Sequence, residues 1–263
     1  GESADAEQLF LRSCLALGEA QEFLGRPTQA LNTYELATRF HPEEKELLLR
    51  LGKLHLSNQQ FENAAESLDA ASQLPNSEGP DAAAGLQAQL GKALTSLGAK
   101  YAAAAAVATS VSSTGGGEGG EDDQGALAEK ALATLKQATA LDVGSALPWY
   151  HTGAVLLLRS TKPPSQNNNK NKGNKTKKTR QQEEDAADAV KALKKALELE
   201  PGLAVAHTLR GQCLVALGQL EEAVAEYEQG LELGEKGNPH AWVKLGDTLA
   251  SLGRNQQQQQ GGR

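Results

Sequence analysis

A glycine recurs along this chain in the same apolar setting, and this repetition constrains the fold more than any other feature. The second copy follows the first after 34 residues, and further copies lie later in the chain. The copies are Leu17-Gly18, Leu51-Gly52, Leu90-Gly91 and Leu245-Gly246, with weaker ones at Thr152-Gly153 and Arg210-Gly211. Self-similarity at such a period is typical of stacked repeats, in which each repeat is one small structural unit.

A second glycine, preceded by a leucine, lies seven residues after four of these glycines. These second glycines are Gly25, Gly98, Gly218 and Gly253. Seven residues are about two helical turns, so we predict that the first glycine faces a neighbouring helix and the second ends the helix. Glycine inside a helix costs about 1 kcal/mol relative to alanine, so its recurrence needs a packing reason. Close approach of paired helices provides one.

A second helix is predicted after most of these glycines, with small, large and small residues in that order on one face. The sets are Ala30, Tyr34 and Ala37; Ala64, Leu68 and Ala71; Ala189, Leu193 and Ala196; Ala223, Tyr227 and Gly230. This order lets one helix approach another closely while the large side chain fills the space between them. The abundance of alanine and an aromatic content of only 4% also favour helices over a β-sandwich.

The unit of 34 residues, with Leu-Gly in its first helix and Ala-Tyr-Ala-Pro in its second, resembles the tetratricopeptide repeat. The stretches 14–42 and 207–233 carry the resemblance most clearly. It implies an all-α, right-handed α-solenoid of antiparallel helix pairs, with about five to six degenerate repeats. It also implies that the first helices line a concave groove and that a peptide or helix of a partner protein binds there.

The low-complexity segments predict the domain organisation. We expect repeats 1–3 in 7–112, a Gly/acidic linker in 113–125, and a helix followed by the first helix of repeat 4 in 126–159. A Lys/Asn-rich disordered insertion is expected in 160–182. The second helix of repeat 4, repeat 5 and the first helix of repeat 6 are expected in 183–253, and a Gln/Gly-rich tail in 254–263. The alanine run 100–111 is predicted to pair with a helix over 84–97. Residues 99–125 are either an insertion within one repeat or contain an extra unpaired helix.

Charge argues against nucleic acid as a partner. The formal net charge is −7, and residues 160–182 hold seven basic residues and no acidic one, so the rest of the chain is more acidic still. Phosphate binding depends on clustered Lys and Arg. The segment Lys177–Arg180 fits a minimal nuclear-import pattern, but its Asn-rich surroundings favour a solvated, disordered loop. We expect an intracellular, cytoplasmic protein, with a nuclear location as the alternative.

The sequence also bears on membrane spans and on the N-terminus. No run reaches 18 apolar residues, so we expect no membrane span. The chain contains no methionine, so we expect it to begin within a longer polypeptide.

The sequence contains no recognisable set of catalytic or cofactor-binding residues. The run 115–120 matches the letters of a dinucleotide fingerprint, but no strand precedes it and acidic residues follow. The five histidines show no metal-ligand spacing. Cys14 and Cys213, far apart within apolar helical patterns, are predicted to be buried thiols. We therefore expect no metal, no cofactor and no enzymatic activity.

The function that this reading favours is a non-catalytic scaffold or adaptor, a subunit of a larger assembly that binds a partner segment in its groove. The alternative is the substrate-selecting arm of an enzyme whose catalytic domain lies outside this chain. The predicted groove residues are Arg12, Glu19, Arg50, Lys53, Gln89, Lys92, Tyr150, Leu157, Lys244 and Asp247. Arg50, Lys53 and Lys92 would form a basic patch for an acidic partner, unless they are ordinary solubilising charges. The oligomeric state stays open.

Overall fold

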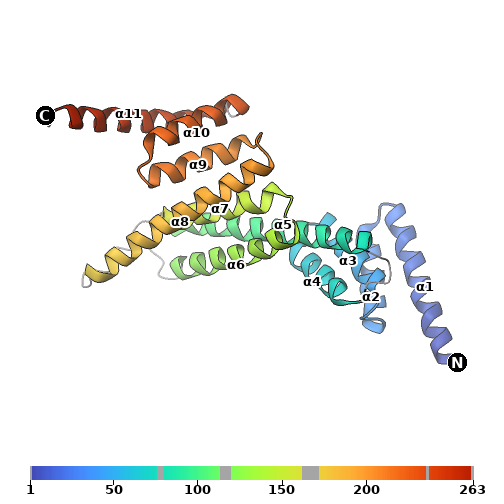
Figure 1. The fold of residues 1–263 in the computed structure, drawn as a ribbon. Coiled ribbons are helices and arrows are strands. Elements are labelled where there is room, and N and C mark those ends of the chain that lie inside the picture. The colour runs from blue at the N-terminus through green and yellow to red at the C-terminus, as the bar shows by residue number, and fades with distance from the viewer. Residues whose placement is uncertain (1, 76–79, 113–119, 162–171, 235–236, 262–263) are drawn as a thin grey trace. The chain divides into compact units, whose positions relative to one another are not determined.

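The computed structural model describes residues 2–75, 80–112, 120–161, 172–234 and 237–261, which are helical almost throughout and contain no strand. The helices in chain order are α1 (Glu2–Phe23), α2 (Pro27–Phe40), α3 (Lys45–Ser57), α4 (Phe61–Gln73), α5 (Pro80–Ser112), α6 (Gly120–Leu141), α7 (Ala146–Ser160), α8 (Lys172–Leu199), α9 (Ala204–Ala216), α10 (Leu220–Leu233) and α11 (Pro239–Gly261) (Figure 1).

The chain forms two compact units. The first comprises Gly1–Leu97 and Ala140–Asp142, and the second comprises Gly98–Thr139 and Val143–Arg263. Helix α5 therefore begins in the first unit and ends in the second.

Helices pair in the order in which they follow one another along the chain. In the first unit α1 packs on α2 and α3 on α4; in the second, α7 packs on α8 and α9 on α10. Figure 1 shows α7 to α11 lying one after another in the second unit. The predicted all-α solenoid of antiparallel helix pairs is confirmed.

The glycines of the first helices are the points of closest approach, as the sequence predicts. A Cβ atom at Gly52 would lie 2.5 Å from Cγ of Leu68, and one at Gly211 would lie 2.8 Å from a ring carbon of Tyr227. Gly18 faces the ring of Tyr34 in the same way. In each case the large side chain of the second helix occupies the space that a side chain in place of the glycine would need.

The third pair differs from the prediction. The segment 84–97 and the alanine run 100–111 form one continuous helix, α5, so the run is not a separate partner helix. Alanine has the highest helix propensity, and nothing in the run interrupts the helix. The partner is α6: Gly98 lies inside α5, where its Cβ would be 2.6 Å from Cγ of Leu135. Gly98 is therefore the packing glycine of the third pair and does not end a helix.

Two of the four predicted helix-ending glycines do end helices. Gly25 follows α1 with φ 68°, and Gly218 follows α9 with φ 78°. This left-handed region is strained for residues with a Cβ atom, which is why glycine occupies both turns. Gly253, in contrast, lies within α11.

Helices extend into segments that the sequence predicts to be irregular. Helix α6 begins at Gly120, α8 at Lys172, and α11 continues to Gly261. Gln, Lys, Arg and Glu are good helix formers, and acidic residue types suit a first turn, so propensity extends these helices beyond their packed parts. Parts of the predicted linker and insertion, 113–119 and 162–171, lie outside the described residues.

Each unit has its own apolar core. Tyr34 and Tyr227 are the largest fully buried side chains, one in each unit. Cys14 and Cys213 are free and buried, as predicted. Among the described residues, no helix is both long enough and apolar enough to cross a membrane.

Candidate partner-binding groove

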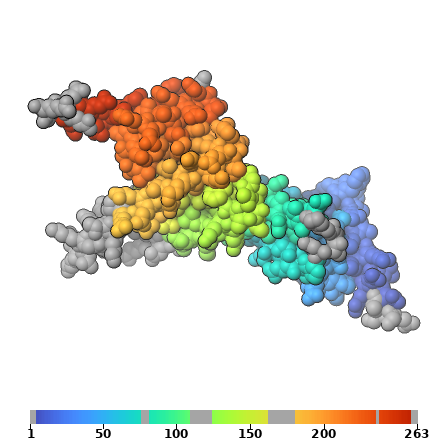
Figure 2. Space-filling view, in the orientation of Figure 1, coloured from blue at the N-terminus to red at the C-terminus, as the bar shows by residue number. Residues whose placement is uncertain are grey.

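A hollow of about 330 Å³ opens in the second unit beside α9 and α11. Figure 2 shows α9 and α10 of this unit packed closely together in orange, with α11 in red. The hollow is lined by Thr161, Gln212, Val215, Ala216, Tyr227, Lys244, Asp247, Thr248 and Ser251. These residues come from the end of α7, from α9 and α11, and, for Tyr227, from α10.

The repeat register explains why these side chains meet. Gly211 faces α10, so the next residue, Gln212, is turned about 100° away from the partner helix. Asp247 follows Gly246 in the same way. Ala216 and Ser251 lie four residues further along their helices and therefore share the faces of Gln212 and Asp247.

The floor of the hollow is uncharged and its rim is polar. Burial raises the pKa of Tyr227 to about 12, and neighbouring Cys213 raises it further. A hydrogen bond with Thr248 acts in the opposite direction and lowers this pKa. The tyrosine is therefore neutral at physiological pH. Val215 is 37% exposed, and Lys244 and Asp247, three residues apart on α11, supply one charge of each sign.

The predicted residues of the first unit do not form the expected basic patch around Arg50. The Arg50 guanidinium donates to Glu19 and, over 2.7 Å, to Glu46, and lies 3.8 Å from Glu22. Glu22 also accepts a hydrogen bond of 2.7 Å from the hydroxyl of Tyr34, whose pKa is raised by burial and by this bond. Arg50 is thus neutralised by carboxylates that hold α1 against α3.

The other predicted residues of this unit come from three different helices, α1, α3 and α5. Arg12, Lys53 and Lys92 are exposed, whereas Gln89 is half-buried. The prediction treated Gly91 as the equivalent of Gly52, but Gly98 takes that place, so Ala99 and not Lys92 corresponds to Lys53.

The predicted apolar part of the groove needs a correction. Leu157 is only 6% exposed and belongs to a core cluster of α7, α8 and α9, so it offers no surface to a partner. Helices α8 and α9 cover the face of α7 on which it lies. Tyr150 is half-buried against the same cluster, and its ring meets that of His151 edge-on at 4.9 Å. Of the ten predicted residues, only Lys244 and Asp247 line the hollow.

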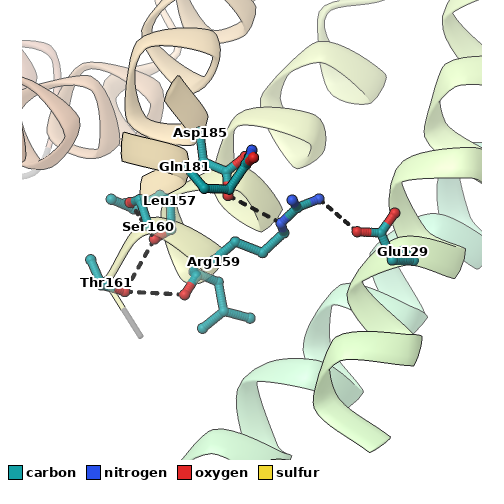
Figure 3. A network of polar contacts seen from close by, with 8 residues as sticks. Glu129, Leu157, Arg159, Ser160, Thr161, Gln181 and Asp185 are labelled. Atoms are coloured by element: carbon teal, nitrogen blue, oxygen red, sulfur yellow. Dashed lines mark hydrogen bonds and ion pairs between the residues drawn. The ribbon is translucent and has the colours of Figure 1, made fainter. Parts of the chain in front are cut away.

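A second polar cluster ties three helices of the second unit together. Arg159 of α7 donates to Glu129 of α6 over 2.8 Å and lies 3.2 Å from Asp185 of α8 (Figure 3). Gln181 donates to the same Asp185 over 3.2 Å. The Asp185 side chain is only 9% exposed, so its charge is balanced within the structure, and the role of this cluster is to join the helices.

Two family models, both described as the tetratricopeptide repeat, match residues 15–79 and 181–242. The first range runs from within α1 to just past the end of α4, and the second contains the pair of α9 and α10. The chain is a tetratricopeptide repeat protein.

Solved structures include tetratricopeptide-type neighbours of low sequence identity. A crystal structure of MamA protein superposes with a TM-score of 0.51 at 19% identity, over 86% of this chain and 93% of the other. The thermophilic tetratricopeptide protein TTC0263 of Thermus thermophilus gives a TM-score of 0.39 at 22% identity, over 93% of this chain and 99% of the other. Comparison with curated proteins finds no match.

Sequence reasoning missed most of the residues that line the hollow of this tetratricopeptide repeat protein. The missed residues are Thr161, Gln212, Val215, Ala216, Tyr227, Thr248 and Ser251. A usable signal was present, because the residue after a packing glycine and the residue one turn later lie on the same face of a first helix. Applied to Gly211, this rule finds Gln212 and Ala216.

Proposed function

We propose that this protein is a non-catalytic scaffold that binds a segment of a partner protein in the hollow beside α9 and α11. The observation that carries the proposal is the lining of that hollow, in which an uncharged, exposed floor at Val215 and Ala216 adjoins the charged pair Lys244 and Asp247. Sites for peptides combine an apolar anchor position with a few polar groups that fix orientation. The tetratricopeptide fold supports the same function.

The lining favours a partner segment of mixed character. One apolar side chain would contact Val215 and Ala216, while groups of opposite charge would face Lys244 and Asp247. We further propose that the protein acts as a subunit of a larger assembly through such contacts. The alternative, a substrate-selecting arm of an enzyme, would place a catalytic domain in the same polypeptide outside these residues.

The test is selection of peptides from a random library on the whole chain, followed by calorimetry with purified variants. Asp247→Lys and Lys244→Glu should each weaken a selected peptide at least about tenfold, because each reverses a charge beside the bound segment. The matched control is Glu228→Lys on α10, which is exposed and does not line the hollow. Its affinity should stay within about twofold. Failure to select any peptide, or equal losses in all three variants, would contradict the proposal.

A further inference from the structure

Helix α11 presents an exposed stripe in which large and small residues alternate. Trp242, Gly246, Leu249 and Gly253 are spaced by four, three and four residues and therefore lie on one face of the helix. We call this set the α11 stripe. Trp242 is 52% exposed and Leu249 46% exposed, and a Cβ atom at either glycine would meet nothing within 4 Å.

The α11 stripe lies apart from two other faces of α11. Ala241, Leu245 and Thr248, which are at most 7% exposed, face the neighbouring helices α9 and α10. Lys244 and Asp247 line the hollow. In Figure 1, α11 is the last helix of the second unit, beyond α10.

The five helix pairs of the described residues indicate what covers such a face. In each pair a glycine of the first helix receives a large side chain from the second: Tyr34, Leu68, Leu135, Leu193 and Tyr227. Gly246 occupies the equivalent position in α11, and no described residue fills the space above it. In this fold, a large residue of one helix therefore packs on a small residue of the next. Among the first helices of the described residues, α11 is the one whose glycine has no large side chain packed on it.

Two copies of the α11 stripe can pack on each other with large residues opposite small ones. When two copies of α11 lie antiparallel, Trp242 of each copy opposes Gly253 of the other, and Leu249 of each opposes Gly246 of the other. A parallel pair would place tryptophan on tryptophan and glycine on glycine, which combines overpacking with voids. The stripe also carries no charge that would oppose itself across a two-fold axis.

We propose that the α11 stripe binds a second copy of this chain through an antiparallel, two-fold symmetric pairing of α11 helices. A symmetric dimer uses the same patch on both copies, and a self-complementary patch meets that condition. The contact involves one helix from each copy and is smaller than the roughly 1,600 Å² of a standard interface, so the dimer is weak and forms at micromolar concentration. It leaves the hollow at Lys244 and Asp247 open to a partner segment.

Sedimentation equilibrium of the full chain up to about 200 µM tests the pairing. Wild type should self-associate to a dimer, and Gly246→Leu should weaken the dimer at least about tenfold, because leucine would meet Leu249 of the other copy. The folded monomer tolerates this change, since the position is open within one chain. The matched control is Gly85→Leu, another open helical glycine, which should leave the dimer unchanged.

A reciprocal variant keeps the test decisive. Adding Leu249→Ala to Gly246→Leu restores a large residue opposite a small one, so the double variant should recover dimerisation to within about threefold of wild type. Circular dichroism of each variant at low concentration verifies helicity. A wild type that stays monomeric throughout the range, or a dimer indifferent to Gly246→Leu, would overturn the proposal and would leave the stripe to a helix of a different protein.

Cross-linking tests the antiparallel orientation. Pro239→Cys combined with Gln256→Cys places two thiols about 25 Å apart along one helix, too far for an internal disulfide, which needs Cα atoms within about 7 Å. The antiparallel pair brings position 239 of one copy beside position 256 of the other, so oxidation should give covalent dimers. The native Cys14 and Cys213 are buried. Efficient cross-linking of either single variant with itself would indicate a parallel pair and refute the geometry.

Discussion

At the scale of single residues, the fold depends on glycines that receive large side chains. Gly52 and Leu68 illustrate the rule, since a Cβ atom at the glycine would come within 2.5 Å of the leucine. Such a glycine is unfavourable for an isolated helix but allows the pair to close. Mutations at these positions therefore report on helix pairing, whereas open glycines report only on helix propensity.

Gly52→Leu is expected to lower the free energy of unfolding by about 1–3 kcal/mol, because it overpacks the contact with Leu68. Gly85→Leu, at an open position of α5, should be neutral or stabilising by up to about 1 kcal/mol through better helix propensity. Urea denaturation followed by circular dichroism measures both. Equal losses in the two variants would show that Gly52 is not a packing position.

Protonation of His151 should couple stability to pH. Burial lowers the pKa of this histidine, so the unfolded chain binds its proton more readily than the folded one. The contribution of His151 is fully present above the unfolded pKa of about 6.5 and is lost as pH falls through the folded value. Denaturation at about pH 7.5 and about pH 5.5 should show this loss, and His151→Gln should reduce it. An identical pH dependence in the variant would contradict the assignment.

At the scale of elements, the sequence predicts pairing reliably and the exact register less so. Gly91 and Gly98 lie seven residues apart and so on nearly the same face of α5. Periodicity cannot distinguish which of them meets a large side chain. That choice depends on where α6 places Leu135, and a long stretch separates the two residues in the chain. The same dependence on distant elements explains why Leu157 was wrongly predicted to line the groove. Its place in the repeat pattern suggests an exposed groove position, but α8 and α9 cover it.

A double-mutant cycle tests the register of the third pair. Gly98→Ala should destabilise the fold because its Cβ atom would lie 2.6 Å from Leu135. With Leu135→Ala in the background, the cost of Gly98→Ala should fall by about 1 kcal/mol, since the clash is gone. Additive effects would mean that the two residues do not touch and that Gly98 is not the packing glycine of the third pair.

The Arg159 cluster should stabilise the joint between α6, α7 and α8. Arg159→Ala leaves the carboxylate of Asp185 buried without its cation, and we expect a loss of about 1–3 kcal/mol, less than for a fully buried pair because Arg159 is 28% exposed. Arg180→Ala is the control, because its pair with Glu184 is largely exposed and should contribute less than about 0.5 kcal/mol. Thermal melts compare the two, and a larger loss for Arg180→Ala would contradict this role.

At the scale of the whole molecule, the two units offer different surfaces. In the first unit the predicted basic residue Arg50 is held by carboxylates, so only Lys53 and Lys92 remain as exposed cations of the predicted patch. In the second unit the pair Lys244 and Asp247 lies beside an uncharged floor. The sequence identified that pair through the repeat register, but the enclosure of the hollow by α7 and α10 depends on tertiary packing. We therefore propose that the partner binds to the second unit.

Photo-crosslinking of a library-selected peptide tests this assignment most directly. A photoreactive amino acid replaces Gln212 inside the hollow in one variant and exposed Glu228 of α10 in another. The account predicts that the peptide cross-links at position 212 and not at position 228, and that excess unmodified peptide suppresses the product. Cross-linking at position 228 with none at 212 would place the bound segment outside the hollow and contradict the central claim.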